Sequence, residues 1–286
     1  MIVNKLNINK IVWYIYRKNT MQQNTGKNRN IIDKFYTKPG IVQKYINTAL
    51  SYIDNTELII EPSAGNGVWL KNLKRYNFIG YDIEPEDETV IKQNFLELDL
   101  NIYNENIHFI GNPPFGRQSS MARKFIKHIC SYKQSKTIAF ILPKSFKKHS
   151  YQKAFPLRYH LVYQEDVEKN AFLINDISYD VPCVFQIWKQ KDINREIPKK
   201  QVPKGFTFVR KEETPHYSLR RVGVYAGKIS NEIENKSKQS HYFIKLDNDH
   251  EDFVNKYNTI KWNHDNTVGP KSISKQEYII ELNKLF

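Results

Sequence analysis

The feature that most constrains this chain is an apolar, strand-length run that ends in two prolines, at residues 107–116 (IHFIGNPPFG). Proline fixes φ and has no backbone N–H, so the ladder of a sheet cannot continue through Pro113 and Pro114. Asn112 is therefore left at the end of the predicted strand. In open α/β sheets ligands bind just beyond the carboxyl ends of the strands, so this amide is well placed for chemistry.

The residues at this strand end suit an amine carried by a flat ring. The side-chain oxygen of Asn112 is one hydrogen-bond acceptor, and the carbonyl of Pro113 is a second. Two acceptors match the two hydrogens of one NH2 group. Phe115 adds an aromatic face on which a heteroaromatic base can stack. The alternative interpretation is an ordinary Asn-Pro turn, which is common.

A second stretch has the pattern of a strand, a turn of small residues and a helix. The strand is predicted to end at Glu61, and Gly65 and Gly67 in the turn allow a backbone to approach a ligand closely. About twenty residues further on, the run 78–82 ends in Asp82, where dinucleotide-binding folds place an acid that accepts both ribose hydroxyls. A solvated aspartate at a strand end is the alternative.

The remaining elements follow from hydrophobic periodicity. Apolar residues at helical spacing after Pro39 predict a helix that starts near that proline and runs to Ile53. A further helix is predicted across 122–129, followed by a strand at 136–143. Short β-type runs at 161–163 and 183–188 are expected to close the sheet as a hairpin.

The net charge of +14 is unevenly distributed. No acidic residue occurs between Glu105 and Glu165, and this stretch, which contains Asn112, carries eleven Lys and Arg residues. The positive field predicts a polyanionic partner, with nucleic acid first and an anionic membrane surface second. The residues expected to contact phosphates here are Arg117, Lys144, Lys147 and Lys148. A solvated lysine cluster is the alternative for the last two.

Composition excludes several classes of protein. The 286 residues include 40% hydrophobic and 13% aromatic residues, which excludes a wholly disordered chain. No apolar run approaches the roughly 20 residues that cross a bilayer. Cys130 and Cys183 are too few for a zinc site or a disulfide framework, so we expect no metal and an intracellular protein, in the cytoplasm or nucleus rather than secreted.

Four parts are expected along the chain. They are a basic N-terminal arm at 1–30, a catalytic domain at 31–190, a basic linker at 191–205 and a smaller domain at 206–286. In the smaller domain aromatic and basic residues alternate near glycines, a pattern that suits contact with a nucleic-acid backbone, and the expected phosphate contacts there are Arg220 and Arg221. Met21 leaves a later natural start open.

Residues 112–115 (NPPF) resemble the catalytic motif of amino-methyltransferases that use S-adenosylmethionine (SAM), most typically those that methylate N6 of adenine. The resemblance covers residues 35 to about 188, with cofactor motifs before the catalytic motif, as in adenine methyltransferases whose target-recognition region is C-terminal. It implies a Rossmann-like α/β fold. The expected sheet is mostly parallel and seven-stranded, with helices on both faces and an antiparallel final hairpin, and a small C-terminal α+β domain follows it.

The same resemblance assigns cofactor contacts. Thr37 is in a segment similar to the N-terminal cofactor motif and would bind the methionine end of SAM, which Glu61 would also face. Residues 91–96 look like the third cofactor motif, although Asn94 stands where the family usually has Asp. The complete set of expected cofactor contacts is Tyr36, Thr37, Glu61, Pro62, Ser63, Ala64, Gly65, Gly67, Asp82, Ile83, Asn94, Phe95 and Asn112.

For the target, the resemblance implies catalysis by the whole motif, which consists of Asn112, Pro113, Pro114 and Phe115. An aromatic residue in the loop 170–176 would pack against the target base opposite Phe115. Phe172 is the candidate and Tyr179 the reserve, with core packing as the alternative.

Four functions remain open. DNA adenine N6 methylation is preferred because of the added C-terminal domain, and RNA adenine N6 methylation comes second. Protein glutamine methylation comes third, because those enzymes more often carry Tyr at the position of Phe115 and because the surface is basic. A catalytically silent nucleic-acid-binding subunit with the SAM fold comes last, since Asp82 and Asn112 are intact. The oligomeric state and a partner subunit are left open.

Overall fold

The computed structural model divides into two compact units. The first holds Asp33–Val202 and Lys261–Val268, and the second includes Pro203–Ile260 and Gly269–Phe286. The expected basic arm at 1–30 lies outside the described residues. The residues that the structure describes are 35–54, 56–174, 176–248, 252–262 and 266–286.

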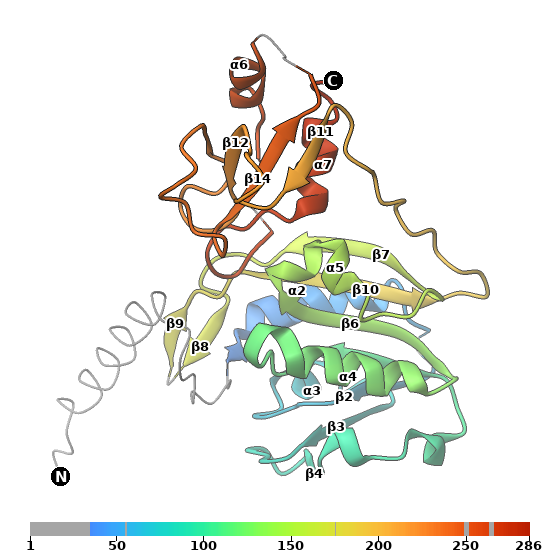
Figure 1. The fold of residues 1–286 in the computed structure, drawn as a ribbon. Coiled ribbons are helices and arrows are strands. Elements are labelled where there is room, and N and C mark those ends of the chain that lie inside the picture. The colour runs from blue at the N-terminus through green and yellow to red at the C-terminus, as the bar shows by residue number, and fades with distance from the viewer. Residues whose placement is uncertain (1–34, 55, 175, 249–251, 263–265) are drawn as a thin grey trace, which may run out of the picture. The chain divides into compact units, whose positions relative to one another are not determined.

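A seven-stranded sheet in the order β4-β3-β2-β5-β6-β10-β7 forms the centre of the first unit (Figure 1). The pairs from β4 to β6 are parallel, and β10 runs antiparallel to both β6 and β7. The expected mostly parallel sheet with a reversed final hairpin is therefore confirmed. The strands are β2 (Leu58–Glu61), β3 (Phe78–Asp82), β4 (Ile91–Lys92), β5 (Ile107–Gly111), β6 (Ser135–Pro143), β7 (Tyr159–Asp166) and β10 (Cys183–Gln190).

Both faces of this sheet are buried, because successive residues of its central strands point to opposite faces and both sets are apolar. In β6, Phe140 packs into one core and Ile141 into the other. Helix α4 (Ser120–Ser131) covers the first face through Phe125, Ile126 and Ile129. Helices α2 (Pro39–Leu50) and α3 (Val68–Asn72) cover the second face (Figure 1).

Helix α2 begins as its sequence predicts, with Pro39 in its first turn. Its buried stripe includes Tyr45, whose ring stacks on Phe185 of β10 with 4.1 Å between the centroids. Shorter elements connect the layers. They are η1 (Phe95–Glu97), η2 (Leu100–Tyr103), η3 (Arg117–Ser119), η4 (Lys144–Lys147) and α5 (His149–Gln152).

A small separate sheet joins two distant segments of the first unit. Strand β1 (Tyr36–Thr37) pairs antiparallel with β8 (Phe172–Ile174), which forms a hairpin with β9 (Ile177–Tyr179). Thr37 lies opposite Phe172 in this register. The pairing attaches the segment expected as the N-terminal cofactor motif to the loop between β7 and β10, a contact that the sequence did not predict.

The segment expected as a basic linker, 191–205, contains no helix or strand, but it is not free of the first unit. The guanidinium of Arg195 donates hydrogen bonds to the carbonyl oxygens of Pro156 at 2.5 Å, Tyr159 at 2.6 Å and Phe155 at 2.9 Å. It also lies over the ring of Trp188, 5.2 Å from the centroid. Arg195 is therefore part of the first unit.

Among its described residues, the second unit contains a four-stranded antiparallel sheet in the order β11-β14-β12-β13 together with two helices, in agreement with the expected small α+β domain. A capping box between Ser274 and Glu277 starts its last helix. The elements are β11 (Phe206–Val209), β12 (Tyr217–Arg220), β13 (Ile229–Ser230), β14 (His241–Leu246), α6 (Phe253–Asn258) and α7 (Lys275–Leu282).

Two features are absent from the residues that the structure describes. None of the helices there is long and apolar enough to cross a membrane. Within the same residues, His, Cys, Asp and Glu side chains do not form a cluster of three or more that would hold a metal ion.

Candidate cofactor and target site

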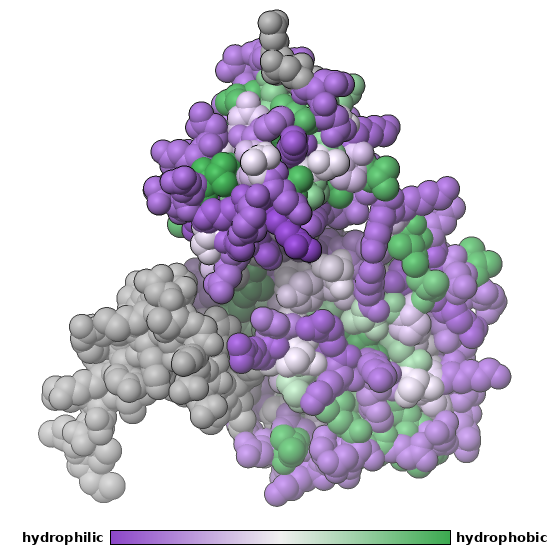
Figure 2. All heavy atoms as spheres, in the orientation of Figure 1, coloured by the Kyte–Doolittle hydropathy of each residue, from purple (hydrophilic) through white to green (hydrophobic). Residues whose placement is uncertain are grey.

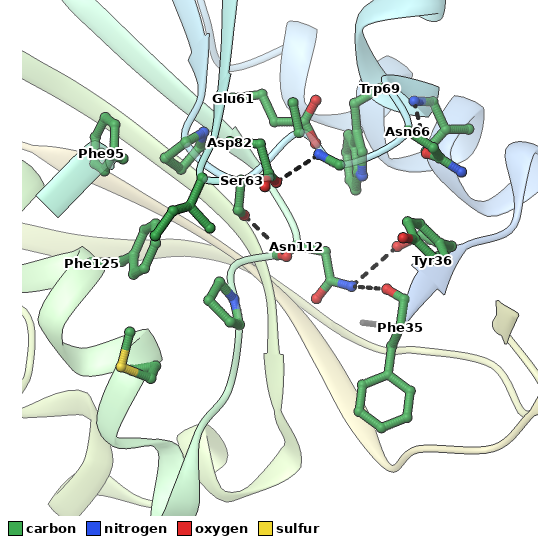
Figure 3. Close-up of a pocket in the computed structure, with 18 of the residues that line it drawn as sticks. Phe35, Tyr36, Glu61, Ser63, Asn66, Trp69, Asp82, Phe95, Asn112 and Phe125 are labelled. Atoms are coloured by element: carbon green, nitrogen blue, oxygen red, sulfur yellow. Dashed lines mark hydrogen bonds between the residues drawn. The ribbon is translucent and has the colours of Figure 1, made fainter. Parts of the chain in front are cut away.

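A cavity of about 270 Å³ lies at the carboxyl ends of β2, β3 and β5 (Figure 3). This is the edge at which open α/β sheets bind their ligands. Most of the predicted site residues meet there although they come from five separate stretches of the chain. The predicted residues that line the cavity are Tyr36, Thr37, Glu61, Pro62, Ser63, Ala64, Gly65, Asp82, Ile83, Asn94, Phe95, Asn112 and Pro114.

The cavity also has walls that sequence reasoning missed. Trp69 of α3 and Phe125 and Met121 of α4 are apolar helix positions, whose spacing signals only burial and not the cavity they face. The lining residues that were not predicted are Phe35, Asn66, Val68, Trp69, Gln93, Leu96, Met121 and Phe125.

The amide of Asn112 is held in one orientation. Its nitrogen donates to the carbonyl oxygen of Phe35 at 3.0 Å and to the hydroxyl oxygen of Thr37 at 3.4 Å (Figure 3). A carbonyl can only accept, so the amide nitrogen must face Phe35. The hydroxyl of Ser63 donates to the backbone oxygen of Asn112 at 3.3 Å and supports the same turn.

The side-chain oxygen of Asn112 is thereby left as an acceptor. It is buried and has no hydrogen-bond partner among the residues that the structure describes. Buried polar atoms are nearly always hydrogen-bonded, so an unpaired oxygen in the wall of a cavity indicates a donor on a ligand. The geometry presents the acceptor that the sequence predicts at this position.

Asp82 connects the end of β3 to the glycine turn. One carboxylate oxygen accepts from the backbone N–H of Gly65 at 2.8 Å, and the other accepts from the N–H of Glu84 at 2.8 Å. Gly65 has φ +49°, in the left-handed region that glycine tolerates best. The turn therefore lies directly against the acid that was predicted to bind ribose.

Gly67 has a different role from the one predicted. It does not line the cavity but precedes α3 with φ +70°. A Cβ atom there would lie 3.1 Å from Cγ of Asp87. The left-handed φ of Gly67 serves the backbone path between the turn and the helix.

Glu61 is the most deeply buried carboxyl of the site. Its side chain lines the cavity while the residue is only 1% exposed, and its Oε2 has no hydrogen-bond partner among the described residues. Burial, and then the negative charge of Asp82, raise the pKa of this carboxyl well above its usual range.

The electrostatics of the cavity differ from those of the chain as a whole. Its described lining contains two carboxyl groups, Glu61 and Asp82, and the unpaired oxygen of Asn112, but it contains no Lys, Arg or His. The chain carries a net charge of +14. A cavity rich in acceptors inside a basic protein favours a ligand that carries positive charge and hydroxyl donors.

The segment expected as the third cofactor motif lines one end of the cavity. The side-chain oxygen of Asn94 accepts from the N–H of Leu96 at 3.2 Å, and its side-chain nitrogen donates to Glu97 at 2.7 Å. This side chain therefore caps the start of η1. The Phe95 ring is buried and stacks on Phe125 with 5.7 Å between the centroids. Asn94 and Phe95 therefore shape the wall, and both also belong to the local packing.

The aromatic residues proposed for the target base are arranged differently from expectation. Phe172 is fully buried and packs edge-on against Phe35, so core packing describes it and the expected base stacking does not. The cause is the pairing of β8 with β1, which turns this side chain inward. Phe115 is not part of the cavity lining, and it stacks on Phe35 at 6.5 Å, while Phe35 stacks in turn on Tyr179 at 5.6 Å.

Several predicted phosphate contacts have protein partners. Lys144 and Lys147 both form ion pairs with Asp166, at 3.2 and 3.0 Å. In the second unit the Arg220 guanidinium donates to the carbonyl of Val222 at 2.9 Å. Arg221 lies over the Tyr242 ring, 4.9 Å from its centroid. The ion pairs partly neutralise the two lysines, and the other contacts restrict the two arginine side chains, so all four are less available to a phosphate.

Other basic side chains remain available on the α4 side of the first unit. Arg117, Lys124 and Lys127 are exposed, and none has an acidic partner within ion-pair distance among the described residues. We call these three residues the α4 basic face. Hydrophilic side chains predominate over this side in Figure 2. Arg117 was predicted, and the two lysines were recognised only as members of the acid-free stretch.

Several solved methyltransferase structures align with this chain at low similarity. No family model and no curated protein matches the sequence. The 23S rRNA methyltransferase ErmE aligns with 56% of this chain and 71% of its own, at 14% identity and a TM-score of 0.44. A putative class I S-adenosylmethionine-dependent methyltransferase from Listeria monocytogenes aligns with 65% of this chain and 70% of its own, at 14% identity and a TM-score of 0.42. The M protein of the type I restriction enzyme EcoKI aligns with 57% of this chain and 45% of its own, at 13% identity and a TM-score of 0.42. At these identities and TM-scores, the structural similarity assigns no activity to this chain.

Proposed function

We propose that this chain transfers a methyl group from SAM to the N6 amine of adenine in nucleic acid, with DNA as the first candidate substrate. The observation that carries the proposal is the unpaired, buried oxygen of Asn112 in one cavity with the carboxyls of Glu61 and Asp82. That arrangement offers an acceptor for an amine next to acceptors for a cationic, hydroxylated ligand.

The hydrogen-bond acceptors and the apolar side chains of the cavity fit SAM. Asp82 is a pure acceptor beside a glycine turn, which suits two ribose hydroxyls, and Glu61 suits the ammonium of the methionine end. Ile83 and Phe95 offer apolar surface for an adenine ring. When bound, the cofactor supplies an electrophilic methyl group on a sulfonium sulfur.

The chain contributes position and electrostatics rather than strong base catalysis. The Asn112 oxygen, fixed by the bonds to Phe35 and Thr37, accepts a hydrogen of the target amine, and the Pro113 carbonyl is the second proposed acceptor. With SAM bound, both acceptors would hold the amine nitrogen toward the methyl group and would stabilise the positive charge that develops on that nitrogen. One proton of the methylated amine would then pass to water.

One set of assays distinguishes DNA, RNA and protein glutamine as substrates. The α4 basic face and the second unit favour nucleic acid over a protein glutamine. A base in a duplex must be flipped out at a cost of a few kcal/mol, which phosphate contacts offset. Methyl transfer to duplex DNA, single-stranded DNA and RNA of matched sequence therefore tests the proposal. Transfer to none of them, with intact cofactor binding, favours the silent subunit or the glutamine alternative.

Replacing Asp82 with alanine is expected to weaken SAM binding by about 1–3 kcal/mol, the range for leaving hydrogen-bonding groups without their partner. The variant also removes the acceptor that holds the Gly65 N–H. Calorimetric titration measures the change. Asp99→Ala is the matched control, because Asp99 caps a backbone turn in the same way but does not line the cavity. An affinity unchanged in Asp82→Ala would place the ribose elsewhere.

Replacing all three residues of the α4 basic face with alanine is expected to make the salt dependence of duplex DNA binding shallower. Each neutralised phosphate contributes about 0.9 to the slope of log K against log salt, so the maximum change is about 2.7. Affinity measured at several salt concentrations tests this. The control has the same charge change at lysines that form ion pairs with nearby acids, Lys71, Lys236 and Lys284. Equal slopes in both triple variants would exclude the α4 basic face from the interface.

A further inference from the structure

We propose that Glu61 is neutral in the empty cavity and becomes a carboxylate when it binds the ammonium group of the cofactor, so that cofactor binding releases one proton. This inference rests on the proposed function and extends it. It assigns the ammonium site to one side chain and predicts how affinity depends on pH.

The position of Glu61 requires a neutral carboxyl when no cation is present. The side chain is at the end of β2, and the residue is 1% exposed. Its Oε2 has no partner among the described residues. An ionised carboxylate that is removed from water without a cation or several donors is very costly, so the proton stays bound.

The neighbours of Glu61 supply no compensating charge. Asp82 of β3 is the charged group that faces it, and its negative charge opposes ionisation further. On the β5 side the neighbour is Gly111, where an added Cβ would lie 3.1 Å from Cγ of Glu61. The rest of the described cavity wall has no Lys, Arg or His. The positive charge that stabilises the carboxylate must therefore come from a ligand.

The proton balance follows directly. A neutral Glu61 carboxyl and a ligand ammonium give a carboxylate paired with the ammonium, and one proton goes to the buffer. Because the pKa of Glu61 is raised in the empty protein and falls on binding, release occurs at pH values between the two pKa values and disappears above the higher one. Within that window affinity is expected to rise with pH, by up to about tenfold per unit.

The test is calorimetric titration of the full chain with two cofactor fragments at one pH, in buffers with different ionisation enthalpies. S-adenosylhomocysteine carries the ammonium, whereas 5′-methylthioadenosine has the same nucleoside without the amino-acid end. We expect S-adenosylhomocysteine to release close to one proton when titrated at pH values inside the window, and 5′-methylthioadenosine to release none. Glu61→Gln should bind S-adenosylhomocysteine more weakly and release none, whereas Asp99→Asn, which lies outside the cavity, should still release the proton.

The outcomes separate this inference from the proposed function. If S-adenosylhomocysteine binds with no proton release at any pH from 5 to 9, the inference is overturned and the cofactor site remains. Equal proton release by both fragments, or by Glu61→Gln and the unaltered chain, also overturns it. The comparison of the two fragments needs no variant and therefore does not depend on whether Glu61→Gln folds. Binding of neither fragment would contradict the proposed function as well.

Discussion

The Asn112→Ala variant is expected to transfer methyl groups about 10² to 10³ times more slowly than the unaltered chain, the typical loss when one preorganised hydrogen-bonding group is removed from a reacting centre. The oxygen that is lost is buried, has no partner among the described residues and is fixed by the bonds to Phe35 and Thr37. SAM affinity is expected to change little, because the amide oxygen acts on the target amine. Single-turnover rates and calorimetry on one preparation measure both quantities.

Asn112→Asp provides the matched second variant. It keeps an acceptor but replaces the donating nitrogen by an oxygen that faces the carbonyl of Phe35, so the two oxygens repel each other. It also adds a negative charge to a cavity wall that already contains Glu61 and Asp82. We expect slow transfer here too. An Asn112→Ala protein with the full rate would show that this amide does not contact the reacting amine.

Arg195→Ala is expected to lower the free energy of unfolding of the first unit by about 3 kcal/mol, because hydrogen bonds to charged groups contribute about 1.5–3 kcal/mol and are not additive. Four backbone carbonyls accept from this guanidinium, those of Gln152, Phe155, Pro156 and Tyr159. Each loses this donor, although the carbonyls of Gln152 and Pro156 still accept from backbone N–H groups. The ring of Trp188 also loses a cation that lies over it. For a unit of this size the expected fall in melting temperature is roughly 6–12 °C.

Thermal unfolding followed by circular dichroism measures the effect, and Arg158→Ala is the control. Arg158 is 53% exposed and forms one ion pair at 4.0 Å with a fully exposed Asp192, so its removal is expected to cost less than about 0.5 kcal/mol. Arg195→Lys should recover only part of the loss, because an ammonium cannot supply the planar fork of donors. Equal melting temperatures for the two alanine variants would contradict the structural role of Arg195.

Local sequence patterns predicted much of the first unit. Pro39 marked the start of α2, and Pro113 and Pro114 ended the strand that carries Asn112. The apolar run in 136–143 predicted β6, and the glycine turn before 68–70 predicted the approach to Asp82. These features depend on residues close together in the chain, where φ restrictions and side-chain periodicity act directly.

Other features depend on contacts that are distant in sequence. Phe172 is apolar and aromatic, which fits a core and a stacking surface equally well, and only the pairing of β8 with β1 turns it inward. Arg195 belongs to a stretch with the composition of a linker, but the carbonyls that bind it are 36 to 43 residues earlier. The charges of Lys144 and Lys147 are reduced by Asp166, which no local pattern associates with them.

By itself, the sequence determined the strands, the turns and the residue types that meet at one sheet edge, because proline, glycine and apolar spacing act over a few residues. Only the tertiary structure decided which atoms of the site are left without partners. The Asn112 nitrogen is satisfied by Phe35 and Thr37, 77 and 75 residues away, so its oxygen is free for a ligand. Burial and the nearby Asp82 raise the pKa of the Glu61 carboxyl well above its usual range, and burial is a property of the packed chain as a whole.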